Sequence, residues 1–172
     1  MEEILLASRL DHTRSEPVGE RAMVDVLALA AEEAARAGVQ VVPADPARGP
    51  FEVDGSVTLL RRMVRNLVEN AVKHGAPPVE VEVFARPQAV EISVRDRGPG
   101  VPAHPRERVF EPFFRPAGST EEAGSWGLGL SLARQIARRH GGEVTCGSGS
   151  DGATMFTATL PTPSQANRSV VI

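Results

Sequence analysis

The apolar residues of this chain repeat with two different periods, and the order of these periods limits the possible folds. We expect helical spacing in three segments and strand-like alternation in six short ones, without the regular strand–helix alternation of a parallel sheet. The expected helices are 21–37, 57–74 and 127–140, and the expected strands are 39–42, 51–53, 79–85, 90–96, 142–147 and 153–160. The pattern predicts an α/β fold, a two-layer sandwich of about three helices on one mixed, mostly antiparallel sheet.

Length and composition support a domain that folds without disulfides or metal. The chain has 172 residues, of which 41% are hydrophobic, so it is long enough to bury a core. Its one cysteine, Cys146, excludes an internal disulfide framework and a cysteine-rich zinc site. The acidic start Met1-Glu2-Glu3 is unlike a signal peptide. We therefore expect a cytoplasmic domain, whose parent protein could still be anchored in a membrane.

Charge and hydropathy argue against two kinds of partner for this segment. The net charge is −3, from 22 acidic and 19 basic residues, which disfavours a nucleic-acid-binding surface. The apolar runs are far shorter than the roughly 18 residues of a membrane-spanning helix. We expect no nucleic-acid partner and no direct membrane insertion by this segment.

Three polar residues of the expected helix 57–74 lie away from its apolar stripe. At about 100° per residue, Asn66, Asn70 and Lys73 share one face off the core. Neutral amides and an ammonium group suit a phosphate-bound Mg²⁺, which takes few protein oxygens and keeps water and phosphate oxygens. An ordinary solvated helix face is the alternative.

An aspartate and two glycines follow the expected strand 90–96, in the order Asp96-Arg97-Gly98-Pro99-Gly100. A fixed carboxylate at this position can accept a hydrogen bond from an amino group such as that of adenine, and the glycines allow a ligand to approach the backbone. A plain turn is the alternative.

A second glycine-rich run, Gly124-Ser125-Trp126-Gly127-Leu128-Gly129-Leu130, leads directly into the expected helix 127–140. The unpaired N–H groups at the start of a helix form an anion-binding site. A flexible linker before a helix is the alternative.

The segment 97–126 has no sustained hydrophobic period and is rich in glycine, proline, arginine and glutamate. An irregular stretch of this length inside a compact domain is typical of a functional lid or a disordered loop. Three of the six phenylalanines lie between Phe110 and Phe114.

Other common ligand motifs are missing from the sequence. The run 147–152 has the spacing of a dinucleotide-binding motif but connects two expected strands, so it is interpreted as a hairpin turn. The chain contains no P-loop, no metal-type histidine spacing and no nucleophile-elbow serine. Hydrolase triads are therefore not supported.

Four motifs resemble, in order, the N, G1, F and G2 boxes of the catalytic ATP-binding domain of bacterial sensor histidine kinases. They are Asn66-Leu67-Val68-Glu69-Asn70-Ala71-Val72-Lys73-His74, Asp96-Arg97-Gly98-Pro99-Gly100, Phe110-Glu111-Pro112-Phe113-Phe114-Arg115 and Gly127-Leu128-Gly129-Leu130. The resemblance spans about residues 18–161. It implies the Bergerat (GHKL-type) fold, with residues 97–126 as the ATP lid.

The resemblance implies ATP and Mg²⁺ as cofactors and assigns roles to individual positions. Asn70 would bind Mg²⁺ through its amide oxygen, Asn66 would support that site, and Lys73 would contact phosphate. Asp96 would accept a hydrogen bond from the adenine amino group, and Arg115 would contact the γ-phosphate. The other implied contacts are His74 with ribose or adenine, Gly98 and Gly100 with the adenine, Gly127, Leu128, Gly129 and Leu130 with the phosphates, and Thr154 with the adenine pocket.

The sequence also departs from the pattern of this family. His74 stands where a tyrosine is common, and Trp126 stands where a small residue is usual. The related gyrase, mismatch-repair and heat-shock-chaperone ATPases have a glutamate at the position of Asn66, so we expect hydrolysis by this chain alone to be feeble.

None of the four histidines is followed by the acidic residue that follows the family's phosphoacceptor histidine. We expect residues 1–17 to be the end of a dimerisation helix and its linker, 18–161 the catalytic domain and 162–172 a flexible tail. The resemblance then implies transfer of the γ-phosphate to a histidine on a dimerisation hairpin outside this chain, with a response regulator as an indirect partner. The alternatives are a non-catalytic ATP-sensing module and a serine kinase of the anti-sigma-factor type.

Overall fold

The computed structural model describes residues 20–42, 49–102, 106–114 and 127–163. In chain order these contain β1 (Ala22–Asp25), α2 (Val26–Arg36), β2 (Gln40–Val41), β3 (Glu52–Gly55), α3 (Val57–His74), β4 (Glu80–Arg86), β5 (Ala89–Asp96), the short 3-10 helix η2 (Arg108–Phe110), α4 (Gly129–Arg139), β6 (Glu143–Ser148) and β7 (Thr154–Pro161). The expected succession of helices and strands is confirmed, with one strand added at the start.

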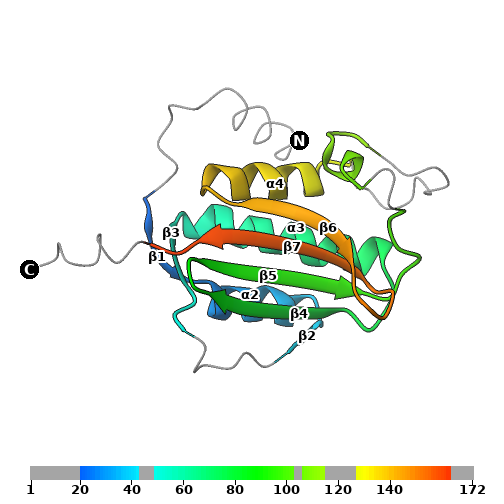
Figure 1. Ribbon diagram of the computed structural model, residues 1–172, viewed down its shortest axis with the longest axis horizontal. Coiled ribbons are helices and arrows are strands. Elements are labelled where there is room, and N and C mark those ends of the chain that lie inside the picture. Colours follow the sequence, from blue (N-terminus) through cyan, green and yellow to red (C-terminus); the bar gives the residue numbers. More distant parts are fainter. Residues whose placement is uncertain (1–19, 43–48, 103–105, 115–126, 164–172) are drawn as a thin grey trace, which may run out of the picture.

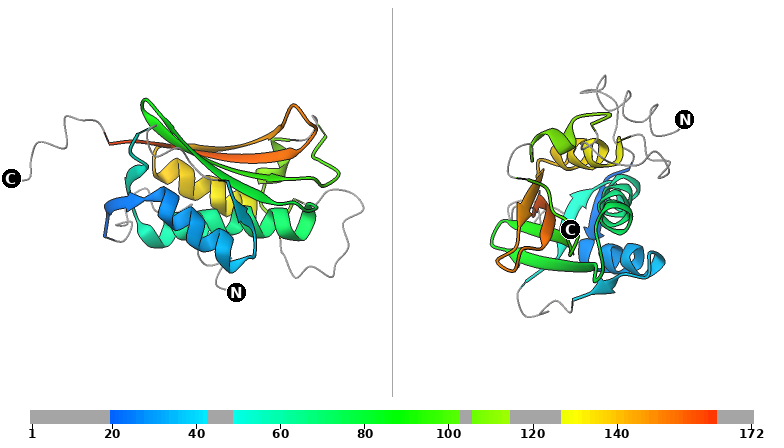
Figure 2. Two further views of the ribbon diagram at one scale, coloured as in Figure 1. Left: turned by 90° about the horizontal axis from the view of Figure 1, so that it is seen from below. Right: turned by 90° about the vertical axis from the view of Figure 1, so that its right-hand side faces the viewer.

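The main sheet has five strands in the order β2-β4-β5-β7-β6. Only the short pairing of β2 with β4 is parallel, and the other neighbours are antiparallel. The three α-helices cover one face of this sheet, as the side view in Figure 2 shows. The expected two-layer sandwich on a mixed, mostly antiparallel sheet is therefore confirmed, and a separate ribbon of β1 and β3 lies at one end (Figure 1).

The core lies between the sheet and the helices. Alternate residues of β4 and β5 point into it, so Val81, Val83 and Ile92 are buried, as the strand alternation predicts. From the helical layer, Leu67 of α3 and Leu132 of α4 are fully buried. Burial of apolar area on this scale is the main favourable contribution to the stability of such a domain.

The expected helix 21–37 is wrong in its first turn. Residues Ala22–Asp25 form β1, which pairs with β3, and Met23 is 49% exposed. The helix starts only after Asp25, whose carboxylate accepts the Ala28 N–H at 3.0 Å. Pairing with a strand distant in sequence overrides the helical spacing at this point.

Helix α3 begins and ends where the sequence predicts. Ser56 is its N-cap, with the side chain accepting the Leu59 N–H at 3.5 Å, and Gly75 follows its last residue. In Figures 1 and 2 it lies in the middle of the helical layer, between α2 and α4. This central position brings neighbours to three sides of the helix.

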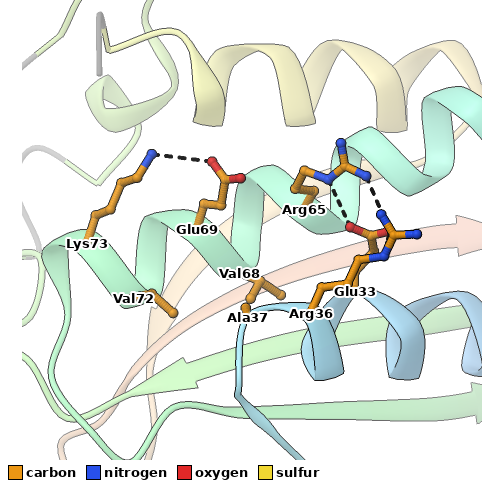
Figure 3. Close-up of a pocket in the computed structure, with 8 residues that line it drawn as sticks. All are labelled: Glu33, Arg36, Ala37, Arg65, Val68, Glu69, Val72 and Lys73. Atoms are coloured by element: carbon orange, nitrogen blue, oxygen red, sulfur yellow. Dashed lines mark hydrogen bonds and ion pairs between the residues drawn. The ribbon is translucent and has the colours of Figure 1, made fainter. Parts of the chain in front are cut away.

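A buried ionic cluster joins α2 to α3 on the outer side of the helical layer. The Glu33 carboxylate, 1% exposed, accepts hydrogen bonds from Arg61 at 3.0 Å and from Arg65 at 2.9 Å. Burial alone would raise the pKa of Glu33, but the hydrogen bonds from Arg65 and Arg61 outweigh it and lower that pKa. Figure 3 shows Glu33 and Arg65 of this cluster at one side of a groove between the two helices.

Candidate functional site

The predicted site residues gather at one end of the molecule. Helix α3 and strand β5 end there, while helix α4 and strand β7 begin there (Figure 1). Four segments distant in sequence therefore contribute side chains or backbone groups to the same region.

Asp96 is the last residue of β5 and is 3% exposed. Its Oδ1 accepts the Gly98 N–H at 2.7 Å, which fixes the carboxylate at the start of the following loop. In the sheet it stands opposite Thr154, the first residue of β7. Burial of a carboxylate is costly unless its oxygens accept hydrogen bonds. Packing alone therefore does not explain why an aspartate is buried at this position.

Two glycines make room for the Asp96 side chain. A Cβ on Gly75 would lie 2.4 Å from Asp96 Cγ, and a Cβ on Gly98 would lie 2.8 Å from Asp96 Oδ1. Contacts this short would displace the carboxylate. Sequence reasoning named Gly98 but missed Gly75, which brings the end of α3 against Asp96. The sequence feature that could have identified Gly75 is its position directly after Lys73-His74.

Thr154 forms the other wall beside Asp96. It is 4% exposed, and its buried Oγ1 has no hydrogen-bond partner in the part of the chain that the structure describes. A Cβ on Gly100 would lie 3.8 Å from this Oγ1. Because buried polar atoms are rarely left unpaired, the hydroxyl is available to a ligand or to water.

Asn66 belongs to the face of α3 that lies off the apolar stripe, but this face is not exposed at Asn66. Asn66 is 6% exposed, and the first residue of α4, Gly129, stands against it, since a Cβ there would lie 3.9 Å from Asn66 Cβ and Cγ. The helical wheel separates Asn66 from the sheet but cannot reveal that α4 covers that side. Within the described residues, Asn66 Nδ2 is buried without a hydrogen-bond partner.

Asn70 and His74 continue the same end of α3. Asn70 is partly buried and His74 is exposed. Asn70 precedes Gly75 by five residues, about 7–8 Å along the helix, and Gly75 abuts Asp96. Asn70 and Asp96 are therefore on the same side of the molecule, which the magnesium hypothesis requires.

Lys73 is exposed and pairs with Glu69, with 3.3 Å between Nζ and Oε2. In the view of Figure 3 both side chains point toward α4, while Val68 and Val72 point toward α2. All four border the groove of about 310 Å³ that ends at the Glu33 cluster. The ammonium group thus has a carboxylate partner and is not held against Asn66 or Asn70.

The start of α4 has the features of an anion site. Leu128 occupies the N-cap position without a side-chain cap, and no acidic residue lies in the first turn. Its side chain is buried, and Ser131 Oγ donates to its carbonyl oxygen at 2.9 Å. Leu130 packs partly buried against the core. The N–H groups of Gly129 and Leu130 therefore remain available to a negatively charged ligand.

Gly127, the residue directly after the expected lid, contacts Phe113 and Phe114 within it. The Phe113 N–H donates to the Gly127 carbonyl oxygen at 3.1 Å, and a Cβ on Gly127 would lie 2.9 Å from the Phe114 oxygen. Gly127 has φ +68°, a left-handed conformation that favours glycine. The expected lid residues 103–105 and 115–126, including Arg115 and Trp126, lie outside the described residues.

We expect Gly127→Ala to weaken nucleotide binding about tenfold, because its Cβ would clash with Phe114 in a strained conformation. Nucleotide titration and thermal unfolding would be measured together. Gly152→Ala is the matched control, since Gly152 also has positive φ but has nothing within 4 Å of its Cβ position. Equal affinity losses in the two variants would contradict a specific role for the contact with Phe114.

The base of the lid is anchored by Phe110. Its ring packs edge-on against Phe156 with 6.2 Å between centroids, and the Arg134 guanidinium lies 4.7 Å from its centroid. Arg134 also pairs with Glu107 at 2.8 Å and with Glu143 at 2.7 Å. By contrast, Phe113 is 61% exposed. The contacts of Phe110 thus fix the base of the lid on the domain.

The donor set of the site favours a phosphate-bound Mg²⁺ over a metal held by the protein alone. Among the described residues there is no group of three or more histidine, cysteine, aspartate or glutamate side chains that could hold a metal ion. The amides of Asn66 and Asn70 supply neutral oxygens, which suit Mg²⁺ only when phosphate and water complete its octahedron. The residues present therefore fit Mg²⁺ that arrives with a nucleotide.

Comparison with known proteins gives a consistent result. Residues 55–164 match the family described as histidine kinase-, DNA gyrase B-, and HSP90-like ATPase. The signal transduction histidine-protein kinase AfsQ2 of Streptomyces coelicolor is 38% identical over 127 residues, which cover 74% of this chain and 24% of that protein. The probable sensor histidine kinase TcrY of Mycobacterium tuberculosis is 36% identical over 168 residues, covering 94% of this chain and 34% of that protein. The chain thus spans about a quarter to a third of these relatives.

Solved structures agree with the sequence relatives. The ATP-binding domain of PrrB from Mycobacterium tuberculosis is 31% identical with a TM-score of 0.68, covering 84% of this chain and 99% of that one. Full-length ShkA, solved in complex with AMPPNP, is 25% identical with a TM-score of 0.74, covering 95% of this chain and 35% of that one. None of the helices in the described segments is long and apolar enough to cross a membrane. The chain belongs to the histidine kinase-, DNA gyrase B- and HSP90-like ATPase family, and it is an ATP-binding domain of the sensor histidine kinase type.

Proposed function

We propose that this domain binds Mg·ATP and transfers its γ-phosphate to a histidine on a dimerisation hairpin of the parent protein. The observation that carries the proposal is the buried Asp96 carboxylate, which the Gly98 N–H fixes through one oxygen. The second oxygen can accept the adenine amino group. The crystal structure of ShkA with AMPPNP, an ATP analogue, supports this choice of ligand.

The adenine end of the site is formed by β5 and β7. Asp96 would accept the exocyclic amino group, and the unpartnered Thr154 hydroxyl would bond a ring nitrogen directly or through water. Gly98 and Gly100 would line the wall, and His74 at the end of α3 would lie toward the ribose. Guanine carries an oxygen where adenine has its amino group, so a carboxylate acceptor favours adenine.

The phosphate end lies between α3 and the start of α4. Asn70 would bind Mg²⁺ through its amide oxygen, and the buried Asn66 would orient the site with the Nδ2 group that lacks a described partner. When bound, Mg²⁺ would neutralise phosphate charge. Lys73 would have to exchange Glu69 for a phosphate, and Arg115 would reach the γ-phosphate from the lid. The Gly127–Leu130 backbone would donate N–H groups to the phosphates.

Transfer by such a site is mainly positioning and charge neutralisation. The accepting imidazole is itself the nucleophile, so the domain needs no base to activate water. Asn66 is an amide and cannot serve as such a base, and Glu69 is exposed and paired with Lys73. We therefore propose that hydrolysis of ATP by the isolated domain is slow relative to transfer to a histidine.

The same proposal divides this chain into three parts. Residues 1–17 would be the end of a dimerisation helix, 18–161 the catalytic domain and 162–172 a tail. The phosphorylated hairpin would pass its phosphoryl group to a response regulator. The domain would work in the cytoplasm, with its parent anchored in the membrane.

The test is transfer of label from [γ-³²P]ATP to the purified histidine-containing hairpin of the parent protein in the presence of Mg²⁺. We expect acid-labile label on the hairpin, and none when the phosphoacceptor histidine is replaced by glutamine. Tight ATP binding without transfer would favour the non-catalytic ATP-sensing module instead. Label on a serine of a partner protein would favour the anti-sigma-factor type.

A further inference from the structure

His140 is a buried histidine at the C-terminal end of α4, the end opposite to the site residues Gly129 and Leu130. It is 4% exposed, and both ring nitrogens are engaged. Nδ1 lies 2.8 Å from the Ile136 carbonyl oxygen, and the Ser56 N–H donates to Nε2 at 3.1 Å. A carbonyl oxygen can only accept, so Nδ1 carries the proton and Nε2 offers its lone pair. The geometry requires a neutral imidazole in one tautomer.

The partner of Nε2 lies at a junction in the fold. Ser56 is the N-cap of α3, and the preceding residue, Gly55, ends β3. A Cβ on Gly55 would lie 2.6 Å from His140 Cδ2, so the ring is packed directly on the backbone. Gly55 is also paired with Ala22 of β1. His140 therefore contacts the point where the β1–β3 ribbon becomes α3.

Helices α3 and α4 run antiparallel and meet at two fixed points. At the nucleotide end, Gly129 abuts Asn66, and at the other end His140 bonds Ser56. The two points are about 16 Å apart along α4. Between these two points α4 is packed along its length, with Leu132 and Ile136 fully buried. A shift of its C-terminal end at His140 would therefore move the packed helix as a unit, including its first turn beside Asn66.

We propose that His140 is a positioning residue, which joins the end of α4 to the junction of the β1–β3 ribbon with α3 and thereby sets the place of the Gly127–Leu130 loop. The identity of the ligand at that loop rests on the proposed function, but the mechanical link does not. Loss of the hydrogen bond to Ser56 would leave the buried Ser56 N–H unpaired and let the C-terminal end of α4 shift.

The surroundings keep this imidazole neutral. Burial lowers the pKa of His140, and the Ile136 carbonyl opposes that shift. The charged groups near the ring are Arg21, which precedes β1, Asp54 on β3 and Arg139 on α4. Protonation would put a second N–H on the ring, opposite the Ser56 N–H. Because the pKa of His140 is lowered on folding, its contribution to stability is present above about pH 6.5 and declines as the pH falls through its folded-state pKa.

Two amide variants of the full 172-residue chain separate the two bonds. The side chain of Gln in His140→Gln reaches the position of Nε2 and can accept the Ser56 N–H, whereas Asn in His140→Asn reaches only the position of Nδ1. We expect His140→Asn to shift the backbone amide NMR signals of Gly127 and Gly129, to speed hydrogen exchange at Ser56 and to weaken Mg·ATP binding about tenfold. His140→Gln should keep the glycine signals and an ATP affinity within about threefold of wild type.

The wild-type chain provides a further check by ¹⁵N NMR of the imidazole. We expect the Nδ1–H neutral form at neutral pH, and the Nε2–H tautomer would overturn the proposal. So would unchanged Gly127 and Gly129 signals in a folded His140→Asn, or equal changes in both variants. If wild type fails to bind ATP, the proposed function is wrong, but the glycine signals and Ser56 exchange still decide the role of His140.

Discussion

Replacement of Asp96 by asparagine should reduce ATP affinity by about 100-fold while leaving the domain folded. In Asp96→Asn, the side-chain oxygen can still accept the Gly98 N–H now seen at 2.7 Å. The amide NH₂ then takes the place of the second carboxylate oxygen and faces the adenine amino group, so two donors oppose each other. A mismatched hydrogen bond of a charged group in a buried site costs about 3 kcal/mol, which corresponds to roughly 100-fold in affinity.

Nucleotide selectivity distinguishes a loss of base recognition from a general disturbance of the site. Inosine triphosphate carries an oxygen in place of the adenine amino group, and the new NH₂ of Asp96→Asn can donate to it. We expect the preference for ATP over ITP to fall by more than tenfold in the variant, by calorimetric titration of both nucleotides. Asp54→Asn is the control, because Asp54 is a 47% exposed side chain at the β1–β3 ribbon. A uniform loss for both nucleotides would point to disturbed packing around Gly75 rather than to base recognition.

The sequence predicted the central helix and most of the strands for identifiable reasons. Helix α3 combines an apolar stripe, the N-cap Ser56 and the terminal Gly75, so its bounds follow from local signals. Strands β4 and β5 alternate clearly because one face is buried. The segment Ala22–Asp25 was wrongly predicted as the first turn of a helix, since it becomes a strand only through pairing with β3. Pairing between segments so far apart leaves no local signal.

The candidate site shows the same division between local and long-range information. The motif positions of Asp96 and Thr154 could be identified, and the register of β5 with β7 places them side by side. The burial of Asn66 could not be predicted from the sequence, because a helical wheel describes α3 alone and not the α4 helix that packs across it. The Gly75 contact and the Ser56–His140 bond both join elements distant in sequence. Spacing along one helix or loop cannot reveal either contact.

The second large effect is expected for Asn70→Ala, which should remove the dependence of nucleotide binding on Mg²⁺. Asn70 is partly exposed near the end of α3, so its truncation creates no core cavity and the fold should persist. The variant would remove the amide oxygen that we propose as a ligand of Mg²⁺, so phosphate and water would have to complete the coordination of the ion.

The measurement is ATP affinity with Mg²⁺ and with excess EDTA, for wild type and variant. We expect Mg²⁺ to tighten binding to wild type by about 100-fold and to Asn70→Ala by less than about threefold. Gln88→Ala is the matched control, since it removes an exposed side-chain amide from the turn between β4 and β5. Asn66→Ala should instead lower both affinity and unfolding temperature, because Asn66 is buried against α4. If Asn70→Ala keeps the wild-type response to Mg²⁺, the ion is held by other groups and the assignment of Asn70 as its ligand is wrong.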